Sequence, residues 1–225
     1  MISVQSQIYK IVVIAFALTT ISCKHETTRR SSEDVVDTVK TNNDVTDVCE
    51  NYKEIDFPTT KYDHDNVNNV RGVILHHTAE PTVERSLNIL TSKEKSVSTH
   101  IVIDTDGTRY ILATPDMITY HAGYSILGNM EGCNNFTIGV EFQGNTLEEP
   151  LTDDQIASGI EYLQPIIAKY KIPLENIVTH EMVRTAYKQK HPNKRCSGKV
   201  DITQTEYVRF MKALNTTIEL RAKTQ

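Results

Sequence analysis

The sequence predicts an α/β fold: a single domain in which a mixed central sheet is flanked by helices. Short apolar runs typical of buried strands are interspersed with longer segments whose apolar residues recur at helical spacing. These segments do not alternate regularly as strand and crossover helix, which favours a mixed sheet over an all-parallel one. The chain of 225 residues is long enough for one such domain and an additional segment at one end.

Four apolar runs predict the strands. Residues 73–75 and 101–103 are short and uninterrupted, as expected of buried strands. Asp106-Gly107 separates the second run from residues 108–112 and indicates a β-hairpin. Residues 137–142 form a further strand. We therefore expect a sheet that includes one hairpin.

Two helices are predicted by their capping residues. Thr152 and Gln155 form a capping box that opens a helix, and Pro165 inside that helix predicts a kink. Its inward face would carry Ile156, Ile160, Leu163 and Ile167. Thr203 with Glu206 predicts the start of the last helix. The apolar residues of that helix are Tyr207, Phe210, Met211 and Leu214.

The N-terminus differs from the rest of the chain. Lys10 precedes an uncharged stretch, 11–22, that is too short to span a membrane but has the length of a signal-peptide apolar region. It ends at Cys23, in a segment similar to a bacterial lipoprotein cleavage box, although Thr20 stands where Leu is typical. We expect a signal peptide (1–22) and a lipid-anchored protein of the bacterial cell envelope, in the periplasm or at the outer membrane. Cleavage by an ordinary signal peptidase is the alternative.

The remaining boundaries follow from composition. Residues after Cys23 are almost all polar or charged, so this part of the chain cannot bury enough apolar surface to offset its ordering entropy. We expect a lipidated cysteine and flexible tether at 23–56, the folded domain at 57–215 and a C-terminal tail at 216–225. The net charge of -5, with scattered Lys and Arg, argues against a nucleic-acid partner. We expect a monomer.

Two histidines stand where strands end. His76-His77 directly follows the apolar run 73–75, and His180 follows the short apolar run 177–178. Two histidines at the ends of separate strands, with a carboxylate or thiolate as third ligand and water in the fourth position, are typical of a catalytic zinc site. The sequence therefore predicts a Zn²⁺ cofactor.

Six short motifs occur in an order that resembles one enzyme family. They are His76-His77-Thr78-Ala79, Val97-Ser98-Thr99-His100, Asp106-Gly107-Thr108, Tyr120-His121-Ala122-Gly123, the segment 134–141 (Asn-Asn-Phe-Thr-Ile-Gly-Val-Glu) and Thr179-His180-Glu181. Together they are similar to the zinc-dependent type 2 N-acetylmuramoyl-L-alanine amidases, which are related to phage amidases and peptidoglycan recognition proteins. The resemblance covers residues from about 70 to 214.

The resemblance implies an activity and several residue roles. The enzyme would cleave the amide bond between N-acetylmuramic acid and L-alanine in peptidoglycan or in muropeptides. His76 and His180 would hold the zinc ion, and Glu141 would be the general base. Some relatives use a tyrosine on the neighbouring strand, where this chain has Thr99. Residues expected to contact substrate are His121, His77 and Asn135, and His100 is expected to be structural.

The third zinc ligand stays open between two residues. The family pattern places a lysine two residues before an aspartate or cysteine, and both Lys194 with Cys196 and Lys199 with Asp201 satisfy it. Asp201 keeps the spacing to the last helix, and its lysine would stabilise the tetrahedral oxyanion. Cysteine parity favours Cys196, because zinc ligation there would leave Cys49 and Cys133 free to pair.

The same resemblance allows a second function. Some peptidoglycan recognition proteins keep the fold and cleft but lack a zinc ligand, and they bind peptidoglycan without cleaving it. Both histidines, a candidate third ligand, a lysine and Glu141 are present here. The sequence therefore favours the enzyme, with a non-catalytic peptidoglycan-binding module as the alternative.

Overall fold

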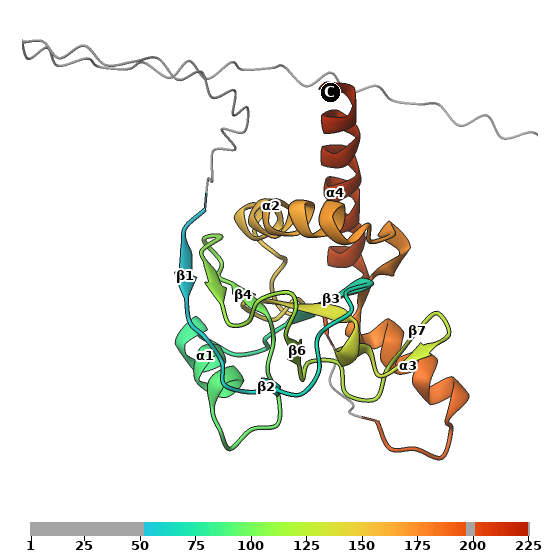
Figure 1. The fold of residues 1–225 in the computed structure, drawn as a ribbon. Coiled ribbons are helices and arrows are strands. Elements are labelled where there is room, and N and C mark those ends of the chain that lie inside the picture. The colour runs from blue at the N-terminus through green and yellow to red at the C-terminus, as the bar shows by residue number, and fades with distance from the viewer. Residues whose placement is uncertain (1–51, 197–200, 225) are drawn as a thin grey trace, which may run out of the picture. The chain divides into compact units, whose positions relative to one another are not determined.

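The computed structural model describes residues 52–196 and 201–224. The predicted signal peptide, Cys23, Cys49 and Lys199 lie outside the described residues. Within these ranges, none of the helices combines the length and apolar character needed to cross a bilayer. Figure 1 shows a central sheet with helices on both faces, as the sequence predicts.

The central sheet has six strands and is mixed. Its order is β1-β5-β4-β9-β3-β10, and β4 and β5 form its antiparallel pair while the other neighbours are parallel. In that order the strands are Glu54–Asp56, Arg109–Ile111, Ile101–Ile103, Thr137–Phe142, Gly72–His77 and Ile177–Thr179. Gly107 turns the β4–β5 hairpin with φ 82°, a conformation that glycine adopts without strain. The predicted hairpin is thus confirmed.

Outside the central sheet and the α-helices, the described residues form two two-stranded sheets and two short 3-10 helices. Strand β2 (Tyr62–Asp63) pairs with β6 (Ile118–Thr119), and β7 (Ile126–Leu127) pairs with β8 (Met130–Glu131). The 3-10 helices are η1 (Cys133–Asn135) and η2 (Leu174–Asn176).

One face of the sheet is covered by α2 (Asp153–Tyr170) and α4 (Gln204–Thr224), which pack on it as the main core. Phe142 of β9 and Phe210 of α4 meet edge to face, with ring centroids 5.6 Å apart. Gly159 of α2 lies beneath both rings, and a Cβ there would come within 3.1 Å of each. A side chain at this position would require one of the two rings to shift, so Gly159 favours the close packing of α2 on Phe142 and Phe210.

The opposite face is covered at its two ends. Helix α1 (Val83–Thr91) packs against Val102 and Leu112 at one end, and α3 (His180–Lys190) packs against Ile74 and Val178 at the other. Figure 1 shows these two helices on the side of the sheet away from α2 and α4. The candidate site lies on this face of the sheet, between α1 and α3.

The predicted capping box of α2 is present, and the helix continues through Pro165 as one element to Tyr170. Proline removes one backbone hydrogen bond. Ile160 and Leu163 before it and Ile166 after it all pack in the core, which holds both halves in register with the sheet.

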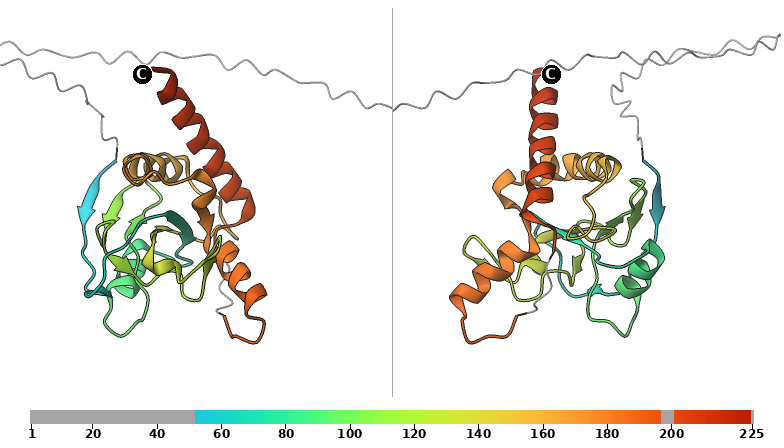
Figure 2. Two further views of the ribbon diagram at one scale, coloured as in Figure 1. Left: turned by 45° about the vertical axis from the view of Figure 1, so that its right-hand side comes forward. Right: turned by 180° about the vertical axis from the view of Figure 1, so that it is seen from behind.

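Both ends of the domain differ from the predicted boundaries. Residues 54–56, assigned to the tether, form edge strand β1, because Ile55 pairs with Tyr110 and Glu54 lies 3.1 Å from the buried Arg109 guanidinium. At the other end, α4 continues through the predicted tail to Thr224. Figure 2 shows α4 crossing α2 and continuing past it, and its side chains are exposed from residue 219 onward.

Candidate metal centre and active-site cleft

Strand alternation separates the two adjacent histidines of β3. Side chains of successive strand residues point to opposite faces. His76 is the register partner of Glu141 on the parallel strand β9, so both project from the face between α1 and α3. His77 projects from the other face, where its Nδ1 accepts from the backbone N–H of Thr146 at 3.0 Å. His76 is therefore the residue that enters the site.

Three buried side chains from distant parts of the chain converge beside the sheet. Nδ1 of His76 lies 3.2 Å from Oδ1 of Asp201, and Nδ1 of His180 lies 2.6 Å from Oδ2. All three potential ligand atoms lie within 4.8 Å of one another. His180 is the first residue of α3, and Thr179 caps this helix by accepting from the N–H of Met182. Asp201 precedes α4 and is fully buried. These groups could hold a metal ion.

The orientation of His180 directs one ring nitrogen at Asp201. Its Nε2 lies 3.2 Å from the carbonyl oxygen of Ala122, which can only accept, so Nε2 carries a proton and Nδ1 is the nitrogen that faces Asp201. Burial raises the pKa of Asp201, but the adjacent His180 and His76 side chains outweigh burial and hold that pKa well below its usual value. A carboxylate oxygen and an imidazole nitrogen 2.6 Å apart need a positive charge between them, either a proton or a metal ion. The donor set therefore fits a metal ion.

The converging groups open into a cavity of about 610 Å³. One wall comes from α1 and the loop after it and is mainly apolar, with Ile89, Leu90 and Val97. The other wall carries Tyr124 and Arg184. His76, His180 and Glu141 all line this cavity, so the two histidines of the candidate metal site and a buried carboxylate face the same space. Such a cavity could admit a ligand directly to a metal-bound water.

Glu141 stands beside the three converging groups. It is buried, and its Oε2 has no hydrogen-bond partner among the described residues. Thr99, where some relatives are expected to have a tyrosine, is fully buried and also leaves its Oγ1 without a described partner. A buried carboxylate oxygen with no internal donor is free to accept a proton from a ligand or water in the cavity.

A family model described as N-acetylmuramoyl-L-alanine amidase matches residues 66–199. The chain belongs to this family. Among curated members, 1,6-anhydro-N-acetylmuramyl-L-alanine amidase AmpD of Haemophilus influenzae is 38% identical over 87 residues, covering 37% of this chain and 46% of its own. N-acetylmuramoyl-L-alanine amidase AmiD of Escherichia coli K12 is 28% identical over 126 residues, covering 49% and 45%. The chain spans about half the length of these relatives.

Solved structures of amidases share the fold. A selenomethionine derivative of AmpD superposes with a TM-score of 0.53 at 19% identity, covering 71% of this chain and 93% of that chain. A mutant endolysin from Bacillus subtilis gives a TM-score of 0.51 at 18% identity, covering 72% and 99%. The predicted α/β architecture is thus confirmed as that of the amidase family.

For the third ligand, the amidase fold brings one of the two candidates to the histidines. Asp201 lies between His76 and His180, whereas Cys196 is half-buried and its Sγ lies 4.0 Å from the carbonyl of Lys194. Lys194 is exposed and does not line the cavity. Its alternative, Lys199, lies outside the described residues. Cys133 is a buried free thiol, and burial raises its pKa.

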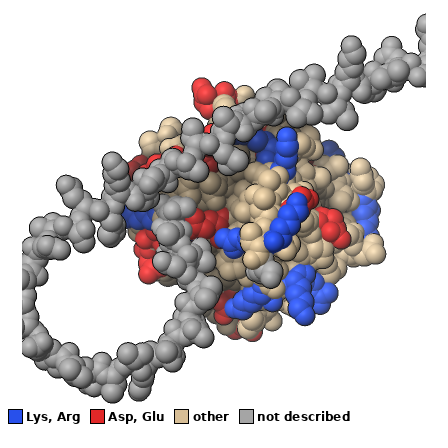
Figure 3. Space-filling view, turned by 90° about the horizontal axis from the view of Figure 1, so that it is seen from above, with Lys and Arg blue, Asp and Glu red and all other residues tan. Residues whose placement is uncertain are grey.

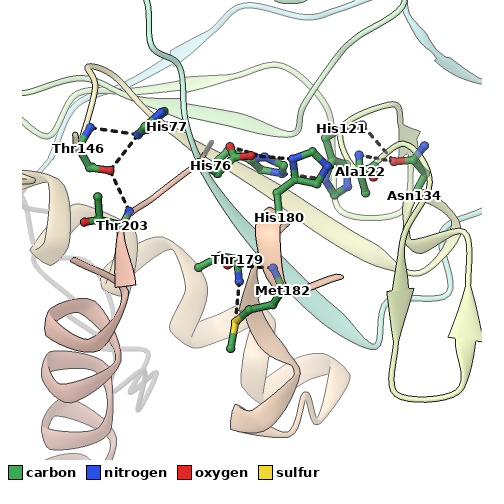
Figure 4. A network of polar contacts seen from close by, with 11 residues as sticks. His76, His77, His121, Ala122, Asn134, Thr146, Thr179, His180, Met182 and Thr203 are labelled. Carbon is green, nitrogen blue, oxygen red and sulfur yellow. Dashed lines mark hydrogen bonds and ion pairs between the residues drawn. The ribbon is translucent and has the colours of Figure 1, made fainter. Parts of the chain in front are cut away.

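The three residues predicted to contact substrate lie in different places. His121 lines the cavity. His77 lies on the opposite face of the sheet, where its Nδ1 is 2.9 Å from Oγ1 of Thr146, and that Oγ1 accepts from the N–H of Thr203 (Figure 4). Through Thr146, His77 thus connects the segment that follows Asp201 to the sheet. Asn135 is exposed and does not line the cavity, because η1 turns its side chain outward.

The buried His100 has the structural role that the sequence predicts. Its Nε2 donates to the carbonyl of Met117 at 2.9 Å, and its Nδ1 accepts from the N–H of Gly139 at 3.0 Å. Burial lowers the pKa of His100 to about 4. Burial and the neighbouring His76 lower the pKa of His121 well below its ordinary value. Both rings are therefore neutral at neutral pH.

Several residues that line the cavity were not assigned to it from the sequence, among them Asn134, Tyr124 and Arg184. Asn134 lines the cavity in place of Asn135, and Tyr124 and Arg184 form its far wall. Arg184 could have been found, because it lies four residues after His180 and an α-helix brings such positions to one face. The spacing becomes informative only once residues 180–190 are known to form helix α3.

Proposed function

We propose that this chain is a zinc-dependent N-acetylmuramoyl-L-alanine amidase, which hydrolyses the amide bond between N-acetylmuramic acid and L-alanine in peptidoglycan or its soluble fragments. The observation that carries the proposal is the convergence of His76, His180 and Asp201 at a cavity that both histidines line together with Glu141. Family membership and the names of the AmpD and AmiD relatives support the substrate class.

The donor set supports zinc as the metal. Two imidazole nitrogens and one carboxylate leave a fourth position of a tetrahedral site for water, as in catalytic zinc sites. When bound, zinc lowers the pKa of its water and polarises the substrate carbonyl. His76, His180 and Asp201 would hold the ion at the end of β3, at the start of α3 and before α4.

The protein's own groups would carry the proton and orient the substrate. Glu141 accepts the proton of the attacking water at its unpaired Oε2 and passes it to the leaving amine of L-alanine. Lys199 remains the proposed cation for the oxyanion, since Lys194 is exposed and outside the cavity. Among the described residues that line the cavity, Arg184 is the one Lys or Arg side chain, and it suits the carboxylates of an acidic stem peptide.

The location of the enzyme is part of the proposal. We propose that lipid-modified Cys23 anchors the protein in the bacterial cell envelope and that the polar segment after it lets the domain reach the wall.

Figure 3 shows that acidic and basic side chains share the face formed around α2 and α4, and that neither sign covers it. We propose a monomeric enzyme without a nucleic-acid partner.

Paired variants of the two ligand candidates test the metal site. Asp201→Ala should lose both bound zinc and the release of peptide from a purified muropeptide, because a site with one water has room for three protein ligands. Cys196→Ser should keep both. Zinc is measured by atomic absorption and peptide release by chromatography. If only the Cys196→Ser variant lost zinc, the third ligand would be the Cys196 thiolate and not Asp201. A wild-type chain that binds muropeptide but releases no peptide would be the binding module instead.

A further inference from the structure

The two metal-binding histidines turn their outer ring nitrogens toward neighbouring residues of one segment. Nε2 of His76 lies 3.3 Å from Nδ1 of His121, and Nε2 of His180 lies 3.2 Å from the carbonyl oxygen of Ala122 (Figure 4). His121 and Ala122 are adjacent in sequence, so one short segment contacts both histidines, His76 through the His121 ring and His180 through the Ala122 carbonyl. Partners of this kind fix the orientation and tautomer of a metal-binding imidazole.

A chain of hydrogen bonds sets the direction of the His76 contact. Thr137 donates its hydroxyl proton to the carbonyl of Cys133 at 2.7 Å, so its oxygen presents lone pairs to Nε2 of His121, 3.4 Å away. His121 therefore carries its proton on Nε2 and accepts at Nδ1. Nε2–H of His76 donates to that Nδ1. His76 is thereby held in the same tautomer as His180, with Nδ1 free to bind a metal.

The side chain of Asn134 holds this segment in place. Its Oδ1 accepts from the backbone N–H of His121 at 3.0 Å and from that of Ala122 at 2.7 Å. Backbone N–H groups can only donate, so the atom where both converge must be the amide oxygen. Two hydrogen bonds to consecutive peptide groups leave that piece of chain little freedom to rotate.

Strand β9 leaves room for the segment to lie close. Gly139 faces His121, and a Cβ at this position would lie 2.6 Å from Cγ of His121 and 2.8 Å from Oγ1 of Thr99. A side chain would push the His121 ring away from the strand. Gly139 therefore leaves space for the His121 ring, and the Asn134 amide holds the backbone that carries this ring.

We propose that Asn134 is a positioning residue for the metal centre: by clamping the backbone of His121 and Ala122 it orients both metal-binding histidines and fixes them as Nε2–H tautomers. This inference rests on the zinc site proposed above. Asn134 also lines the cavity, so loss of activity alone would not separate positioning from substrate contact. The decisive readouts are therefore zinc affinity without substrate and the tautomer itself.

The first experiment measures the zinc dissociation constant of the full chain by chelator competition, without substrate. Asn134→Ala should bind zinc about 10- to 100-fold more weakly, the usual effect of removing a partner behind a metal ligand. Asn134→Asp keeps an oxygen acceptor and should restore affinity close to wild type. Asn135→Ala is the matched control, because its side chain is exposed and outside the cavity, and its zinc affinity should not change.

The second experiment uses the wild-type chain and keeps the tautomer part of the inference falsifiable even if Asn134→Ala fails to fold. In ¹H–¹⁵N spectra of the zinc-loaded protein that correlate ring protons with ring nitrogens, His76 and His180 should both carry the proton on Nε2. A proton on Nδ1 of either ring overturns the inference, as does a folded Asn134→Ala variant with wild-type zinc affinity. A wild-type chain that binds no zinc would instead refute the proposed function.

Discussion

The buried His100 should make the stability of this domain depend on pH in a defined direction. Its pKa is about 4 in the folded protein and 6.5 for an unperturbed histidine, so the unfolded chain binds a proton between these values and the folded chain does not. The stabilising contribution is complete above about pH 6.5. It is lost progressively as the pH falls to about 4. Over that range the lost free energy of unfolding is about 3 kcal/mol.

Urea denaturation at several pH values between 4 and 7 measures this effect, in a chelator so that metal release does not contribute. His100→Gln should be less stable than wild type at pH 7, because it disturbs the hydrogen bonds to Met117 and Gly139. The difference between the two proteins should shrink as the pH falls. The exposed His64 serves as control, since His64→Gln should leave the pH dependence unchanged. A wild-type pH dependence retained in His100→Gln would refute this reasoning.

Three further substitutions test the proposed enzyme. Glu141→Gln should lower turnover about 100- to 10,000-fold with zinc retained, and activity within a few-fold of wild type would reassign the general base. Arg184→Gln should raise KM for muropeptides with acidic stem peptides more than it lowers kcat. A KM equal to that of wild type would show that Arg184 does not bind the substrate. Cys23→Ser should move the protein from the membrane to the soluble fraction with the specific activity of the domain unchanged; an unchanged membrane fraction would disprove the lipid anchor.

The parts of the fold that the sequence predicted are those with strong local signals. The apolar run of β9, the turn at Gly107 and the capping box at Thr152 each depend on residues that are neighbours in sequence. Strand β1 has no such signal, because it is a three-residue edge strand in a polar stretch and forms through pairing with β5. Its existence follows from tertiary contacts.

The site was predictable in its residue types but not in every position. His76, His180 and Glu141 follow from their motifs, whereas Cys196 and Asp201 fit the pattern equally well until the fold places Asp201 between the histidines. Strand alternation could have excluded His77 from the cavity, because β3 points neighbouring side chains to opposite faces. Asn134 and Asn135 could not be told apart, since the turn of η1 decides which of them faces inward.

The metal centre also bears on how the polypeptide is held together. Cys133 and Cys196 are free thiols, so no disulfide joins them, while the three groups that would share one ion come from positions 76, 180 and 201. An ion bound there would act as a cross-link between the sheet, the start of α3 and the segment before α4. At a free zinc concentration 100 times the dissociation constant it would add about 2.7 kcal/mol to stability. Loss of the metal ion would then abolish the proposed activity. It would also loosen the C-terminal helix and make the chain easier to cleave by proteases.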